Sequence, residues 1–113
     1  MKRIYRTNPA YREFQLKTRD ALIAFFNRSS SYIISLPSDS NGLIGTVYCD
    51  GFQFERIGNH IVWAFQRNSN DCTRLLLDGD IEYADCFCDE ASGTTVVFLK
   101  LSGAEMEHQI LVS

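Results

Sequence analysis

The sequence of 113 residues lacks the features that mark several classes of protein. Its longest uncharged apolar run, residues 21–26, is far shorter than the about 20 residues that cross a bilayer, so we expect no membrane partner. The basic N-terminus leads into further charged residues rather than an apolar stretch, which predicts a cytoplasmic protein without a signal peptide. Two prolines and seven glycines exclude collagen-like and low-complexity chains.

Motifs for chemistry are also missing. Cys86 and Cys88 fall two residues apart in a predicted strand, which separates their sulfur atoms by about 7 Å, too far for one metal ion. Neither His60 nor His108 accompanies a nucleophile signature. We therefore expect four reduced cysteines, no metal, no cofactor and no enzymatic activity.

What is present is the composition of a globular protein, with 45% hydrophobic and 22% charged residues. The length fits a single domain that spans residues 1–113. The net charge of −3 disfavours nucleic acid as a partner, but it hides an asymmetry. Residues 1–28 carry a net charge of +5, and residues 29–113 carry −8.

The N-terminal part predicts a helix. Residues 1–7 form a short basic arm, and Thr7, Asn8 and Pro9 then give a helix-start signal, because a capping side chain precedes a proline that tolerates the first turn. Apolar residues recur with the helical period behind this signal. We expect a helix over residues 8–28.

One flank of this helix allows two interpretations. Leu16 and Ile23 fall beside Arg12 and Arg19, away from the apolar face of the expected helix. Either the terminal arm covers these two apolar side chains, or they form a self-association surface that meets the acidic edge of a second copy in a homodimer.

Residues 31–113 have the pattern of an antiparallel sheet, with short apolar strands separated by turn sequences. Asp50-Gly51, Gly58-Asn59 and Asp78-Gly79 are expected to be hairpin turns. The predicted fold class is α+β: an N-terminal helix packed on a curved antiparallel meander of about seven or eight strands, either open or closed into a partial barrel. The turns would set Cys49 opposite Phe52, Phe54 opposite Trp63, Cys86 and His108 opposite Leu99, Cys88 opposite Val97, and Lys100 between Asp85 and Glu107.

Acidic residues are concentrated in one short stretch, in which only Asp85 has an expected internal partner. Dense exposed carboxylates repel one another, so a basic partner would explain them. We therefore predict a small non-enzymatic protein-binding module, an inhibitor or immunity-like domain that binds a basic protein through an acidic sheet edge. The predicted contact residues are Asp78, Asp80, Glu82, Asp89 and Glu90.

Aromatic residues support an alternative function. Residues from the expected helix and from the expected sheet share one face, where they would form either a packed core or an open pocket. The alternative is thus a small-molecule-binding or effector-sensing domain with a pocket between helix and sheet. The pocket residues would be Tyr11, Phe14, Phe52, Phe54, Trp63 and Phe65.

Overall fold

The computed structural model describes residues 2–36, 45–67 and 74–113. These segments are mostly antiparallel sheet with two short helices, which confirms the α+β class. The elements in chain order are α1 (Lys2–Arg6), β1 (Tyr11–Gln15), α2 (Arg19–Asn27), β2 (Tyr32–Leu36), β3 (Gly45–Cys49), β4 (Gly51–Ile57), β5 (His60–Gln66), β6 (Arg74–Asp78), β7 (Ile81–Asp89), β8 (Thr95–Leu101) and β9 (His108–Val112).

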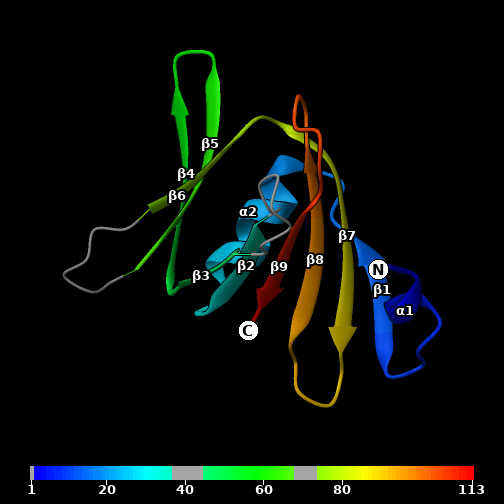
Figure 1. Ribbon diagram of the computed structural model, residues 1–113. Coiled ribbons are helices and arrows are strands. Elements are labelled where there is room, and N and C mark those ends of the chain that lie inside the picture. Colours follow the sequence, from blue (N-terminus) through cyan, green and yellow to red (C-terminus); the bar gives the residue numbers. More distant parts are fainter. Residues whose placement is uncertain (1, 37–44, 68–73) are drawn as a thin grey trace.

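The strands form two sheets instead of one continuous meander. A six-stranded sheet has the order β1-β7-β8-β9-β2-β3, and a three-stranded sheet has the order β4-β5-β6 (Figure 1). The expected meander and the partial barrel are therefore wrong. The physical reason is that the chain leaves the large sheet after β3 and returns to it at β7.

Two of the expected hairpin turns, Asp50-Gly51 and Asp78-Gly79, are instead the points where the chain passes from one sheet to the other. Cys49 pairs with Tyr32 on β2 and not with Phe52, which pairs instead with Phe65 on β5. At the return crossing, Gly79 has a φ of 128°, a conformation that side chains other than glycine rarely adopt. An Asp-Gly pair supplies the backbone freedom for either a hairpin or a change of sheet, so the local sequence does not distinguish them.

The Gly58-Asn59 turn is confirmed as a hairpin. It joins β4 to β5 and sets Phe54 opposite Trp63, as expected from the sequence. The φ of Gly58 is 59°, the left-handed value that this position of a tight turn requires.

The expected helix over residues 8–28 is wrong, because its first half is strand β1. The Asn8 side chain accepts a hydrogen bond from the Ala10 N–H (3.0 Å), which turns the chain, and β1 then pairs with residues 85–89 of β7. The shorter helix α2 begins after Thr18, whose hydroxyl accepts a hydrogen bond from the Ala21 N–H (3.1 Å). In the described part of the chain, neither helix has the length and apolarity that spanning a membrane requires.

The main core lies between the two sheets and α2. We call the side of the large sheet that faces this core the inner face. The Phe26 ring of α2 is 5.0 Å from that of Phe52 and 5.2 Å from that of Phe65. Trp63 is fully buried, and its Nε1 donates a hydrogen bond to the Gly79 carbonyl (2.8 Å), which ties β5 to the return crossing.

The opposite, outer face of the large sheet is covered in part by α1, so the expected basic arm is a folded element. Phe87, Val96 and Phe98 are buried on this face. The Tyr5 ring of α1 lies 5.7 Å from Phe87 and 5.8 Å from Phe98. β7 and β8 are thus packed on both sides.

The expected register between β7 and β8 is shifted by two residues. Cys86 pairs with Val97, the position expected for Cys88, and a β-bulge between Ile81 and Tyr83 accompanies the shift. Each residue keeps its predicted face because the shift is even. The pairing of Leu99 with His108 across β8 and β9 is confirmed.

Lys100 does not lie between Asp85 and Glu107. Its Nζ is 3.2 Å from the Glu82 carboxylate instead, because Tyr83 takes the place opposite Lys100 that was expected for Asp85. The cation that bridges Asp85 and Glu107 is Lys2 of α1.

Candidate functional site

The five acidic residues predicted as a partner-binding edge all have partners within the chain. The expectation that they lack internal partners is therefore wrong, because basic residues of the N-terminal segment and of neighbouring strands lie against four of them and a backbone N–H binds the fifth. The contacts are Asp78 with His60 (3.1 Å), Asp80 with Arg19 (2.7 Å), Glu82 with Lys100 (3.2 Å), Glu90 with Arg12 (3.4 Å), and Asp89 with the Ala91 N–H (3.0 Å).

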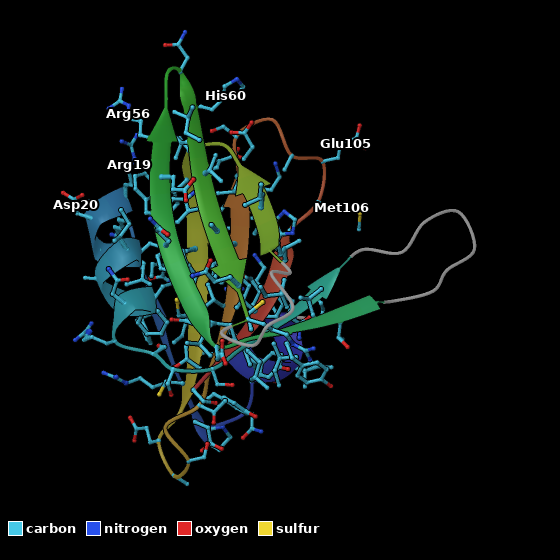
Figure 2. All side chains as sticks on the ribbon, turned by 90° about the vertical axis from the view of Figure 1, so that its left-hand side faces the viewer. Arg19, Asp20, Arg56, His60, Glu105 and Met106 are labelled. Atoms are coloured by element: carbon cyan, nitrogen blue, oxygen red, sulfur yellow. The ribbon has the colours of Figure 1, made fainter. Side chains whose placement is uncertain are left out.

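Arg19 and Asp80 form the best-aligned of these pairs. Arg19 Nη2 lies 2.7 Å from Asp80 Oδ2 and Nε lies 3.2 Å from Oδ1, a two-point contact. The guanidinium lowers the pKa of Asp80 and also lies over the Phe54 ring at 5.9 Å. Figure 2 shows Arg19 at the start of α2, on the same side of the molecule as Arg56 of β4. This pair joins α2 to the return crossing between the sheets.

The six aromatic residues of the predicted pocket do not surround one cavity. Trp63 and Phe65 are fully buried in the main core. Phe14, Phe52 and Phe54 are partly buried against the same core. The sixth residue, Tyr11, belongs to the outer cluster, where its ring lies 5.0 Å from that of Tyr5.

The predicted self-association flank is covered. Leu16 and Ile23 both pack against the main core, because β1 and α2 approach it separately rather than as one helix. Arg12 and Arg19, which were expected beside them, form ion pairs with two different acids of the same chain. All four side chains thus take part in contacts within the chain.

Strand β3 is a candidate site that the sequence did not reveal. Each sheet has two edge strands, and three of the four carry charges: Arg12 and Glu13 on β1, Glu55 and Arg56 on β4, Arg74 and Asp78 on β6. Charged side chains on an edge discourage other chains from pairing with it. The fourth edge, β3, contains no charged residue.

The backbone of β3 offers hydrogen-bonding groups to this open side. Ser31 and Ser113 exchange both backbone hydrogen bonds (3.0 and 3.3 Å), so odd-numbered residues of β2 bond to β9 and even-numbered ones bond to β3. Val47 and Cys49 therefore bond inward to β2, whereas Thr46 and Tyr48 point their N–H and C=O groups outward. Of these outward groups, the Tyr48 carbonyl has a side-chain partner in the described part of the chain, the Arg67 Nε (3.1 Å).

The outer face carries an apolar row that leads to this edge. The row crosses five strands and runs from Phe87 through Val96, Leu111 and Ile33 to Tyr48. Phe87 is fully buried near α1, whereas Tyr48 is 54% exposed at the edge. Strands β9, β2 and β3 contain no acidic residue, lysine or arginine, so this half of the sheet is uncharged.

A hollow of about 250 Å³ lies beside β3. It is lined by Thr46, Val47, Tyr48, Cys49 and Arg67. Burial raises the pKa of the Cys49 thiol, so the sulfur remains a neutral lining group. Burial also raises the pKa of Cys86, to about 12.

The described residues bring no three metal-ligating side chains together. The hollow beside β3 is lined by backbone groups, apolar side chains and one arginine. Comparison of the chain with protein-family models, with curated proteins and with solved structures found no match.

Proposed function

We propose that this protein is a non-enzymatic protein-binding module that receives an extended segment of a partner protein on the edge of β3. The observation that carries the proposal is the missing charge on β3, while the other three sheet edges carry charged residues. An uncharged edge invites pairing with another chain, and recognition domains use such edges to add a strand from a ligand.

The geometry of the edge supports strand addition. Thr46 and Tyr48 direct backbone groups away from β2, and both side chains are exposed. A partner strand would extend the large sheet, and its side chains would continue the apolar row beyond Tyr48.

The proposal includes a cytoplasmic location. Cys49, Cys86 and Cys88 are free, as expected in a reducing compartment. The raised pKa of Cys49 and Cys86 disfavours thiol catalysis by these two residues, because a protonated thiol is a poor nucleophile.

An acidic interface for a basic partner, as in an inhibitor or immunity-like domain, is a second candidate. The side chains of four of its residues are paired within the chain but remain 45–69% exposed: Asp78, Asp80, Glu82 and Glu90. An aromatic small-molecule pocket has less support, because Trp63 and Phe65 are fully buried. The test of the acidic interface is the binding of an arginine-rich peptide. Binding that weakens steeply with salt, and that is weaker still to the double variant Asp78→Asn/Glu90→Gln, would favour the acidic interface over β3.

The test uses random octapeptides displayed on phage and selected on the whole protein. Thr46→Pro removes an outward N–H from β3 without removing a hydrogen bond to β2. The matched control is Gln15→Pro on β1, the opposite edge of the same sheet. Leu16 donates to the Ala84 carbonyl (3.1 Å), so even-numbered residues of β1 bond to β7 and the Gln15 N–H points outward.

We expect selected peptides that bind the wild type and Gln15→Pro alike, and that bind Thr46→Pro at least tenfold more weakly. Circular dichroism and the emission of Trp63 would verify that both variants are folded. Selected peptides that bind both proline variants equally, or a selection that enriches no peptide, would contradict the proposal.

A further inference from the structure

Helix α1 covers an apolar cluster that is separate from the main core. The cluster consists of Phe87, Val96 and Phe98 on the outer face, and each of these residues is at most 4% exposed. Among the described residues, the main core includes none from α1. The packing of the two sheets around α2 therefore does not depend on α1, whereas the burial of the outer cluster depends on it in part.

One side chain provides the apolar contact of α1 with this cluster. α1 contains no buried residue, and its Ile4 is 66% exposed. Tyr5 is partly buried against the cluster, where its ring lies 5.7 Å from that of Phe87. A helix of five residues is not stable without tertiary contacts, so α1 loses its helical structure when it leaves the sheet.

Ion pairs supply the other contacts of α1. The Lys2 Nζ lies 2.9 Å from Asp85 of β7 and 2.7 Å from Glu107, which precedes β9. Arg6 makes a two-point contact with Glu13 of β1, with Nε 3.0 Å from Oε1 and Nη2 2.8 Å from Oε2. The side chains of these five residues are 18–52% exposed, so dissolved salt reaches the ion pairs and weakens them.

We infer that α1 is a reversible cover of the outer face, which detaches when salt screens its ion pairs or when the charge of Lys2 is lost, while both sheets remain folded. Figure 1 shows α1 beside β1, at the far side of the large sheet from β3. Detachment uncovers Phe87, the end of the apolar row that leads to Tyr48. α1 thus controls how much of this row is accessible, and the inference does not require the proposed function of the β3 edge.

Two backbone hydrogen bonds report whether α1 is in place. The Thr7 N–H donates to the Arg3 carbonyl (3.1 Å), and the Asn8 N–H donates to the Tyr5 carbonyl (3.2 Å). Both bonds close the end of α1, and neither belongs to a strand. Detachment of α1 therefore exposes these two amide groups to water and leaves the hydrogen bonds between the strands intact.

The experiment measures amide hydrogen exchange of the whole protein by NMR at about 50 mM and about 500 mM sodium chloride. We expect the amides of Thr7 and Asn8 to exchange about fivefold faster at the higher salt concentration. The amides of Val97 and Ile110, which pair across β8 and β9, should keep their rates because the sheet stays folded.

The loss of ring contact provides a second measurement. The Tyr5 and Phe98 rings lie 5.8 Å apart, so nuclear Overhauser effects between them should be present at low salt and weaken at high salt. Binding of a hydrophobic dye should increase in parallel, because the rings under α1 become accessible.

A variant of Lys2 tests whether charge holds the cover. Lys2→Gln should make the Thr7 amide exchange about tenfold faster at low salt, and Lys2→Arg should behave as the wild type because the positive charge is kept. The matched control is Lys17→Gln, which removes the same charge at an exposed lysine between β1 and α2 and should change neither measurement. If Lys2→Gln does not fold, the salt series on the wild type tests the inference alone.

Two results would overturn the inference. Exchange at Thr7 that responds neither to salt nor to Lys2→Gln would show that the Tyr5 ring, and not charge, holds α1 in place. Exchange at Val97 and Ile110 that accelerates together with exchange at Thr7 would show that α1 leaves only when the large sheet unfolds, so that it is not a separate cover.

Discussion

The Lys2 Nζ lies 2.9 Å from Asp85 Oδ2, although 83 positions of sequence separate the two residues. The same nitrogen is 2.7 Å from Glu107 and lies over the Tyr83 ring at 4.7 Å. Burial opposes the charge on Lys2, but the two carboxylates outweigh it and raise the pKa of Lys2. A helix of one and a half turns is thus fixed to the outer face of the sheet by tertiary contacts, since so short a helix is unstable alone.

Removing the aromatic anchor of α1 should destabilise the protein. We expect Tyr5→Ala to lower the free energy of unfolding by about 2 kcal/mol, because its ring covers Phe87 and Phe98. Urea denaturation measures this change, and increased binding of a hydrophobic dye would report the uncovered rings. Ile4→Ala in the same helix is the control, because Ile4 is 66% exposed and should change stability little. Equal effects of the two substitutions would show that Tyr5 does not anchor α1.

Reversing the charge of Asp80 should lower the melting temperature. Asp80→Arg would set two guanidinium groups together, and the second change Arg19→Asp should restore part of the loss by inverting the pair. The combination of Asp80→Lys and Glu82→Lys should likewise destabilise the fold, because it breaks the pairs with Arg19 and Lys100. Glu105→Arg is the control, at an exposed residue on a loop away from Arg19 (Figure 2). A double variant Asp80→Arg/Arg19→Asp that melts at no higher a temperature than Asp80→Arg alone would contradict this role of the pair.

Leu16 should affect stability and not association. It is partly buried against the main core, so Leu16→Ala should cost about 1–2 kcal/mol of unfolding free energy. The exposed neighbour Lys17 provides the control Lys17→Ala, which should change little. Light scattering should give the same oligomeric state for wild type and Leu16→Ala. An altered oligomeric state with unchanged stability would return Leu16 to a self-association surface.

His108 should make stability depend on pH. Its Nδ1 is buried without a hydrogen-bond partner among the described residues, and burial lowers its pKa below the ordinary 6.5. The unfolded chain therefore binds a proton more readily than the folded one. The stabilising contribution is complete above about pH 6.5 and decreases as the pH falls below it, by at most about 1.4 kcal/mol per pH unit.

Urea denaturation between pH 7.5 and 5.5 would measure this dependence. His108→Gln should reduce the slope, because the titrating group is gone. The control Gln53→Ala changes an exposed residue of β4 that does not titrate, and it should keep the slope. An unchanged slope in His108→Gln would show that other groups cause the pH dependence.

Local features of the fold were predictable where short-range chemistry determines them. The Gly58-Asn59 turn and the pairing of Phe54 with Trp63 follow from a left-handed turn between alternating strands. The helix over residues 8–28 failed because the sequence of Tyr11–Gln15 is compatible with both strand and helix. Pairing with β7, whose residues come about 75 positions later, determines the outcome.

The candidate site depended on information that one sequence does not contain. Residues 45–49 are visibly uncharged, but only the order of strands shows that they form an edge. The acidic cluster was visible, yet its pairing with Arg12, Arg19 and Lys100 depends on the fold. Composition identified the charged groups, and topology determined which of them neutralise one another.

The position of β9 has a consequence for the order in which the chain can fold during synthesis. β9 lies between β8 and β2, so the two halves of the large sheet meet only through it. Before residues 108–112 leave the ribosome, β2 and β8 each present an unpaired strand edge. The emerging chain can complete the β4-β5 hairpin early, because its strands are adjacent in sequence, but the large sheet must wait. A delay at this stage would expose two apolar edges at once, and a nascent chain would then be most susceptible to aggregation.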